Sequence, residues 1–403
     1  MVEASPPVLF AALYREEGTT GVHTHVRQVR RYLEECGTPT AYISSYSWRR
    51  ALTIPVFGFR RALVPFSTSA GVAWFRYWHE LFLHNALRQT LARAGDCVVY
   101  AQGPQEARAA LRTRQGLHQR VVMACHFRTS QADEYAAPGR EEVSRDGTTF
   151  RAIRQLEREV ILQVDGIVYV SRWARNALLS WLPEAAAVPS AILSNFVASL
   201  HFDPNQELLG DLVTSGTLEP RKNHQFVLEV LAEARRAGRS LTLDLFGEGP
   251  LRNDLERLAR SLGLEGQVRF RGYRSDVTEF LPRYRAYVHA SQSESSSLAI
   301  IEAMAAGLPI VAGNIGPISE LCDDGVEARF WSLDDPAQAA ATLIDLLGCE
   351  PARLKAARAA SERFRREFSA DVVAPRLRSF LLGMPPLASD AALPSGLPSS
   401  SVP

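Results

Sequence analysis

The stretch AYVHASQSESSSLAIIEAMAAGLPIVAG, residues 286–313, is the clearest guide to the fold of this chain. Two short apolar runs, at 286–291 and 308–313, enclose a polar loop and an apolar segment long enough for a helix. Buried parallel strands that are joined by a helix show this pattern. The stretch therefore predicts a strand–helix–strand unit inside a parallel sheet.

The same alternation extends in both directions along the chain. We expect further strands at 8–14, 40–45, 97–103, 120–126, 166–171, 191–195, 211–218, 241–247 and 268–273. We expect helices at 22–35, 150–163, 223–236, 250–262, 297–306, 335–347 and 351–366. Strands that alternate with helices predict the α/β class, with doubly wound Rossmann-like sheets.

The polar, turn-forming segment HFDPNQELLG, near 201–210, marks a boundary between two such domains. We expect an N-terminal Rossmann-like domain at 1–205 and a C-terminal one at 206–368. A helix at 369–383 follows and is expected to pack back on the first domain. The tail at 384–403 is rich in Pro, Ser and Ala and is predicted to be disordered.

Composition indicates an ordinary globular protein. Of 403 residues, 46% are hydrophobic and 22% are charged, and the net charge of +1 argues against a general nucleic-acid binder. The first 200 residues have 23 Arg against 17 acids, whereas the rest has 22 bases against 27 acids. This asymmetry fits an anionic partner of the first half, and it equally fits chance surface composition.

Cysteine usage and the N-terminus predict a cytoplasmic chain. The five cysteines are odd in number and form no C-x-x-C pair, which favours reduced and mostly buried thiols. The first residues lack the basic segment of a signal peptide, and no stretch reaches 18 apolar residues.

Residues 54–83 combine Trp74, Phe75, Tyr77, Trp78 and Phe82 with three arginines. Such a mixture suits an interface that is partly apolar and partly anionic, and it predicts peripheral contact with the inner face of a membrane. An ordinary buried helix with arginines that reach the solvent uses the same residues, and core packing favours that alternative.

The loop after the first expected strand argues against a dehydrogenase. Residues 15–21 read REEGTTG, which is not the G-x-G-x-x-G of a dinucleotide site. The second expected strand ends in SSY, at 44–46, with no acid for a ribose. What remains is a helix start at Gly21, where backbone N–H groups are able to approach an anion.

The segment 291–307 carries the strongest chemical signal. Glu302 is a lone carboxylate in an apolar helix, and Glu294 lies in the loop before that helix. An isolated carboxylate of this kind needs a donor, such as a ribose hydroxyl. The N–H groups of Ser296, Ser297 and Leu298 are expected to be free for a phosphate. A capping residue and a stray core acid are the structural alternative.

Lysine usage singles out one more position. The chain has only two lysines, Lys222 and Lys355, against 43 arginines. Lys222 lies directly after a strand, in GTLEPRKN at 216–223, where a compact ammonium is a good partner for a diphosphate.

Together these segments resemble the GT-B glycosyltransferases, specifically the retaining glycosyltransferase family 4, over roughly residues 6–383. The most specific element is E-x7-E, from Glu294 to Glu302. The further matching segments are AMA at 303–305, GLP at 307–309, GPISE at 316–320, GTLEPRKN at 216–223, FGEGP at 246–250, GY at 272–273, GVHTHV at 21–26 and CH at 125–126.

The resemblance implies catalytic roles for His126, Glu294 and Lys222. It implies that Glu302 holds the donor ribose, that Glu294 contacts the donor sugar and that Lys222 neutralises the leaving diphosphate. His126 would lie beside the donor sugar and the incoming acceptor hydroxyl. The full set expected to bind the donor is Gly21, Thr217, Arg221, Lys222, Gly247, Gly249, Tyr273, Glu294, Ser296, Ser297, Leu298 and Glu302. No metal and no cofactor are implied, because the nucleotide sugar is a co-substrate.

This sequence departs from the family pattern in three places. Thr20 replaces the family's first loop glycine. Thr217 replaces the usual second basic phosphate ligand, for which Arg221 or Arg128 is a substitute. Ser295 and Ser297 replace two loop glycines, which narrows the loop conformations available.

We therefore predict a retaining hexosyltransferase that uses GDP-mannose or a UDP-sugar. Its acceptor is expected to be a hydroxyl of a glycan or of a lipid-linked intermediate in surface polysaccharide or glycoconjugate synthesis. Two alternatives remain: a non-catalytic subunit that binds sugar nucleotides or glycans, and a GT-B sugar-nucleotide epimerase.

Overall fold

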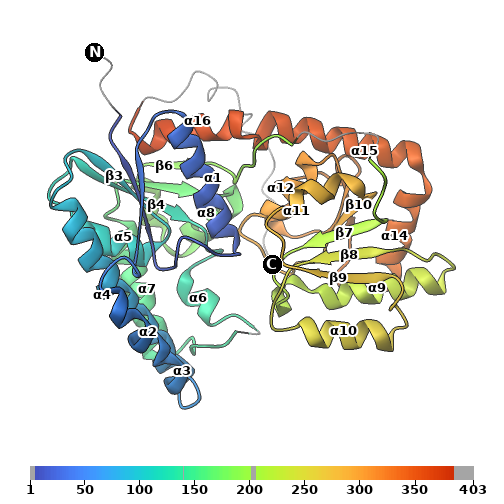
Figure 1. Cartoon of the computed structure of the whole chain (residues 1–403), viewed down its shortest axis with the longest axis horizontal. Coiled ribbons are helices and arrows are strands. Elements are labelled where there is room, and N and C mark those ends of the chain that lie inside the picture. The colour runs from blue at the N-terminus through green and yellow to red at the C-terminus, as the bar shows by residue number, and fades with distance from the viewer. Residues whose placement is uncertain (1–4, 139, 201–205, 385–403) are drawn as a thin grey trace.

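The computed structural model describes residues 5–138, 140–200 and 206–384, and it contains two parallel sheets that lie side by side, each covered by helices (Figure 1). The first six-stranded sheet has the order β2-β1-β3-β4-β5-β6. Its strands are β1 (Val8–Ala12), β2 (Thr40–Ser44), β3 (Cys97–Ala101), β4 (Gln119–Cys125), β5 (Gly166–Tyr169) and β6 (Ser190–Ile192).

The second six-stranded sheet has the order β12-β11-β10-β7-β8-β9. Its strands are β7 (Leu212–Ser215), β8 (Leu243–Phe246), β9 (Val268–Gly272), β10 (Ala286–His289), β11 (Ile310–Gly313) and β12 (Ala328–Trp331). Both sheets are parallel throughout, so the α/β class and the doubly wound design predicted from the sequence are confirmed. The short edge strand β12 was not expected.

Helices connect the strands of each sheet. Those of the first half are α1 (Gly21–Glu35), α2 (Arg50–Gly58), α3 (Arg60–Leu63), α4 (Thr68–Leu91), α5 (Pro104–Leu111), α6 (Gln131–Tyr135), α7 (Thr148–Ile161) and α8 (Arg172–Trp181). Those of the second half are α9 (His224–Arg236), α10 (Arg252–Ser261), α11 (Val277–Phe280), α12 (Leu298–Ala305), α13 (Gly316–Ser319), α14 (Pro336–Gly348), α15 (Glu350–Arg363) and α16 (Ala370–Leu381). No helix in the described ranges is long and apolar enough to cross a bilayer.

The inner strands of each sheet are buried on both faces, which is why they read as mostly apolar runs. The largest fully buried side chains include Tyr100 and Met123 in the first sheet and Tyr287 in the second. Three of the five cysteines are buried, and the described chain has no disulfide between them.

The last helix returns to the first half of the chain, as the sequence predicted. α15 and α16 run along one edge of the molecule, past both sheets (Figure 1). Val373, Ala374, Leu377 and Leu381 of α16 are buried with Val8 and other residues of the first sheet. The expected boundary at 205/206 adjoins residues 201–205, which lie outside the described ranges, as does the predicted tail except for Met384.

The aromatic segment 54–83 divides into two parts. In α4, Phe82 is buried and Trp78 and Trp74 pack in an aromatic row. In contrast, Ile54 and Phe66 are among the most exposed large apolar side chains. The alternative of an ordinary buried helix therefore fits Phe82 in α4, but neither Tyr77, which is 62% exposed, nor the residues before the helix.

Candidate active site

Glu294 is the centre of a charged cluster between β10 and α12. Its Oε1 accepts a hydrogen bond from Lys222 Nζ at 2.6 Å, and its Oε2 accepts one from Arg221 Nη1 at 3.1 Å. His289 Nε2 lies 3.3 Å from the same Oε1. Only 7% of the Glu294 side chain is exposed, so both cations are needed to offset the cost of burying the carboxylate.

The same contacts keep Glu294 ionised. Burial by itself would raise the pKa of Glu294, but Lys222, the hydrogen bond from His289 and Arg221 outweigh burial and hold this pKa well below its usual range. Burial lowers the pKa of His289, so that ring is neutral near pH 7. The cluster is thus one carboxylate held between two cations.

A third cation reaches this loop from the first half of the chain. Arg128 follows β4, and its guanidinium donates a hydrogen bond to Ser293 Oγ. Arg221 also donates to the Ser293 carbonyl at 2.8 Å. Both candidates for the second basic ligand therefore converge on the residue before Glu294. Thr217 follows β7, at the position where the family pattern has an arginine.

Gly247 and Gly249 allow two loops to touch. A Cβ on Gly247 would lie 1.8 Å from the Gly216 carbonyl oxygen, and one on Gly249 would lie 2.4 Å from the Leu218 carbonyl oxygen. Gly247 also has a φ of +148°, a conformation that L side chains rarely adopt. These contacts hold the backbone that leads to Lys222.

The start of α12 is an uncapped helix end. Ser297 occupies the N-cap position without a side-chain hydrogen bond to the helix, and the hydroxyls of Ser296 and Ser297 are buried without a partner in the described chain. The first amides of a helix carry partial positive charge and favour an anion. Gly21, at the start of α1, faces this end, because a Cβ there would lie 3.6 Å from Leu298 Cδ1.

Glu302 lies one turn into α12, on the same helix. It is only partly accessible, and no described residue donates a hydrogen bond to its carboxylate. Burial raises its pKa to about 7. A half-buried carboxylate without a donor is what a ligand hydroxyl would satisfy.

His126 directly follows β4 and sits in a buried polar network. Its Nε2 lies 3.0 Å from Gln102 Oε1, and Gln102 donates its own amide to the Tyr100 carbonyl. That orientation makes Nε2 the protonated nitrogen and leaves Nδ1 as an acceptor. Burial and the nearby His25 hold the pKa of His126 well below its usual range, so the ring is neutral.

His25 supports this ring from α1. The two rings meet edge to face, with centroids 4.8 Å apart. His25 is fixed by Asn195 Oδ1 and by the Tyr100 hydroxyl, each at 3.0 Å. Gln102 and Asn195 were not predicted as site residues. Their signal is a polar side chain just after an apolar strand, at the sheet edge where ligands bind.

A large cavity of about 1340 Å³ lies beside α1. Residues 15–19 and His23 line it from the first half, and Tyr273 lines it from the second. No described contact joins Tyr273 to the cluster around Glu294.

Glu320 joins the two halves of the chain. Its carboxylate accepts hydrogen bonds from the backbone N–H groups of Arg172 and Trp173, at 2.8 and 2.5 Å, and so caps α8. Ser171 Oγ donates to the Ser295 carbonyl at 2.7 Å in the same contact. The sequence marked Glu320 only as part of a family turn.

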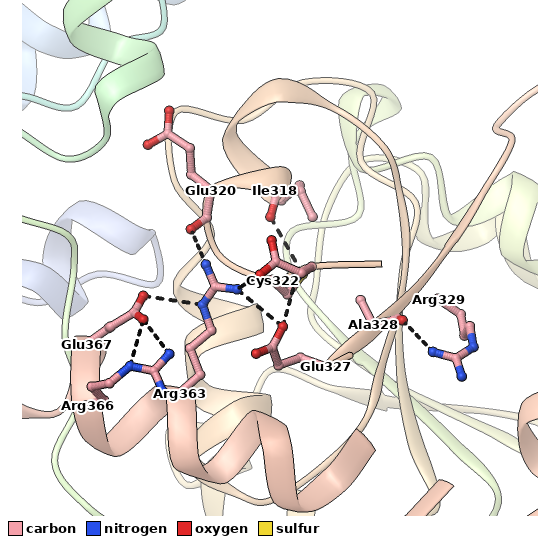
Figure 2. Close-up of polar contacts among 10 residues, drawn as sticks. Ile318, Glu320, Cys322, Glu327, Ala328, Arg329, Arg363, Arg366 and Glu367 are labelled. Atoms are coloured by element: carbon pink, nitrogen blue, oxygen red, sulfur yellow. Dashed lines mark hydrogen bonds and ion pairs between the residues drawn. The ribbon is translucent and has the colours of Figure 1, made fainter. Parts of the chain in front are cut away.

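Arg363 holds the loop that carries Glu320. It donates to the Glu320 carbonyl at 3.1 Å and to Asp323 and Glu327 at 2.9 and 3.2 Å. Figure 2 shows the Glu320 carboxylate pointing away from Arg363, which leaves it free for α8. The described ranges contain no group of three or more His, Cys, Asp or Glu side chains placed to hold a metal ion. Metal-independence stays a prediction.

Two facing α/β domains with a cleft between them define a GT-B fold, and comparison with solved structures agrees. A sucrose-phosphate synthase from Thermosynechococcus elongatus has a TM-score of 0.72 at 15% identity, covering 93% of this chain and 98% of its own. Anabaena HepE in complex with UDP and glucose has a TM-score of 0.66 at 17% identity, covering 94% and 100%.

Residues 204–363 match the family model of glycosyl transferases group 1. A phosphatidyl-myo-inositol mannosyltransferase from Mycolicibacterium smegmatis is 24% identical over 86% of each chain. An exopolysaccharide phosphotransferase from Streptomyces coelicolor is 29% identical over 52% of this chain, which spans only 22% of that relative.

Proposed function

We propose that this chain is a retaining, metal-independent hexosyltransferase. It would move a hexose from a nucleotide-diphosphate sugar, GDP-mannose or a UDP-sugar, to a hydroxyl of a glycan or lipid-linked acceptor. The observation that carries the proposal is the segment 293–302, where an ion cluster, an uncapped helix end and an unpartnered carboxylate lie together. The named activities of the relatives support a role in polysaccharide or glycoconjugate synthesis.

The donor would be held at three points. The diphosphate binds the amides of Ser296, Ser297 and Leu298, with Lys222 and Arg221 beside them. The ribose hydroxyls donate to Glu302, which satisfies its carboxylate. Glu294 contacts the sugar, and its salt bridge to Lys222 keeps both groups in place before the donor arrives.

The transfer itself would rest on charge stabilisation. As the bond from the sugar to the diphosphate breaks, negative charge grows on the phosphate oxygens beside Lys222 and the start of α12. The neutral Nδ1 of His126 accepts a hydrogen bond from a hydroxyl near the reacting carbon. The acceptor hydroxyl adds to that carbon on the same face, and the leaving phosphate takes its proton.

Donor discrimination tests the proposal. We expect UDP or GDP to bind selectively in calorimetry, and the corresponding nucleotide sugar to release its diphosphate slowly without an acceptor. Glu294→Gln should abolish this release. Glu219→Gln is the matched control, because the Glu219 carboxylate also pairs with Arg221, and among the described residues its side chain contacts neither Lys222 nor Glu294. A chelator should leave release unchanged.

Three outcomes would contradict the proposal. If neither nucleotide binds, the donor site is assigned wrongly. If a nucleotide binds and no nucleotide sugar turns over with any acceptor, the chain is a binding subunit. If the recovered sugar nucleotide is an epimer, the chain is an epimerase.

A further inference from the structure

A segment at one tip of the molecule exposes an unusual amount of apolar surface. We call residues 49–66 the apolar arm, which includes α2 and α3 (Figure 1). Ile54, Phe59 and Phe66 are 76, 48 and 90% exposed. Exposed apolar side chains of this size, gathered on one segment, indicate a surface that contacts a partner.

The charge around the apolar arm has one sign. Residues 36–79 contain five arginines and no Asp or Glu. Arg60 is paired with Glu142, at 3.0 Å, and Arg76 is buried. Arg61 is exposed and has no carboxylate partner within the described ranges. The surface is therefore apolar and cationic at once.

A groove leads from the apolar arm toward the candidate active site. A cavity of about 340 Å³ lies between Arg61 and Phe57 of the arm and Arg15 and Tyr46 of the sheet edge. It shares Arg15, Tyr46 and Ile54 with the large cavity beside α1. The Arg15 guanidinium stacks 5.0 Å from the centre of the Tyr46 ring and has no carboxylate partner among the described residues.

The other end of the groove approaches the donor site. The large cavity extends to Gly18 and His23, at the start of α1. Gly21, in the same helix turn, faces Leu298 at the start of α12. The charges that line this cavity partly cancel, because Glu16 and Glu34 pair with Arg30, and Glu17 is a further carboxylate in the lining beside Arg27 and Arg31. Arg15 and Arg61 stay available for a ligand.

We infer that the apolar arm docks on a bilayer that contains anionic phospholipid, and that the groove receives the phosphate-bearing head group of a membrane lipid as the acceptor. Ile54, Phe59 and Phe66 would enter the headgroup layer, while arginines at its edge attract the anionic surface. Arg15 and Arg61 would hold the lipid phosphate. The acceptor part rests on the proposed function, whereas the docking part does not.

Vesicle co-sedimentation tests the docking without any turnover. We expect the full chain to bind vesicles of phosphatidylcholine with phosphatidylglycerol more tightly than vesicles of phosphatidylcholine alone. Phe66→Ser should weaken vesicle binding about tenfold, because the phenylalanine ring that would enter the bilayer is lost. Arg61→Glu should weaken it at least about fivefold, and only for the anionic vesicles.

Matched controls exist elsewhere on the surface. Leu117→Ser removes another highly exposed apolar side chain, and Arg239→Glu reverses another exposed arginine, and both should bind as the unmodified chain does. Thermal unfolding should be alike for all four variants, because none of these side chains is buried.

Several results would overturn the inference. These are equal binding to neutral and anionic vesicles, binding unchanged by Phe66→Ser, displacement by inorganic phosphate alone, and self-association through the arm without vesicle binding. Calorimetry with UDP and GDP on the same samples separates the two proposals. Nucleotide binding without vesicle binding overturns the inference and leaves the proposed function standing. Vesicle binding without nucleotide binding overturns the donor site, and with it the acceptor part, but leaves the docking standing.

Discussion

At the scale of single residues, Glu302 links the stability of the chain to its proposed ligand. Its raised pKa, about 7, means that the folded chain keeps a proton that an unfolded carboxyl releases above about pH 4.3. The free energy of unfolding therefore declines between these two values, and the full penalty applies above pH 7. A ribose hydroxyl that donates to the carboxylate would offset this cost.

For Glu302→Gln we expect opposite effects on stability and on binding. Near pH 8, urea unfolding should give a free energy of unfolding about 1–3 kcal/mol higher, because no charge is buried. Nucleotide affinity should fall about ten- to a hundredfold and lose its increase from pH 6 to 8. Glu265→Gln, at an exposed site, should change neither quantity. An unchanged affinity would remove Glu302 from the donor site.

Gly247 gives a second prediction at this scale. In Gly247→Ala the new methyl group would overlap the Gly216 carbonyl, so we expect a loss of about 3 kcal/mol in stability and of nucleotide binding. Gly238→Ala is the matched control: its φ is also positive, at +80°, but the space around it is open. The free energy of unfolding of that variant should fall by only about 1 kcal/mol, and the variant should still bind the nucleotide. Equal losses of stability in the two variants would mean that backbone strain causes the loss, and not the contact between the two loops.

At the scale of elements, the strand–helix alternation could be predicted because each buried parallel strand is an apolar run of four to seven residues. β12 was missed, and it is an edge strand in which only Ala328 and Trp331 are buried. The exposed α2 and α3 were merged with α4, since their apolar composition resembles that of a core helix. Glu294, Glu302 and Lys222 stand out locally, whereas Gln102, Asn195 and the cap by Glu320 depend on contacts between distant segments.

The cap on α8 carries a prediction at this scale. Glu320→Ala should lower the free energy of unfolding by about 1–2 kcal/mol, because the cap on α8 is lost. Since α8 is then no longer held to α13, the radius of gyration in small-angle scattering should increase. Asp335→Ala removes a comparable cap on α14, but within one domain. It should cost a similar amount of stability without changing the shape. If the two variants scatter alike, Glu320 does not hold the domains together.

At the scale of the whole molecule, α16 makes the stability of the first sheet depend on the end of the described chain. Leu377→Ala should cost about 2–5 kcal/mol, because Leu377 is only 2% exposed among residues of the first sheet. Hydrogen exchange should show the loss in β1, β3 and β4. Leu346→Ala, in the core around α14, should instead affect the second sheet. If Leu377→Ala reduced the protection from hydrogen exchange only in the second sheet, the stability of the first sheet would not depend on α16.

The same helix has a consequence for how the protein is made. The first sheet ends at β6, yet the residues of α16 that complete its core follow about 180 positions later. At roughly 5–20 residues per second, a ribosome needs on the order of ten seconds or more to deliver them. During that interval the first sheet leaves the exit tunnel with one apolar face covered by α1 but not yet by α16. Nascent chains stalled before α16 should therefore bind chaperones that recognise apolar surface, and release them once α16 emerges.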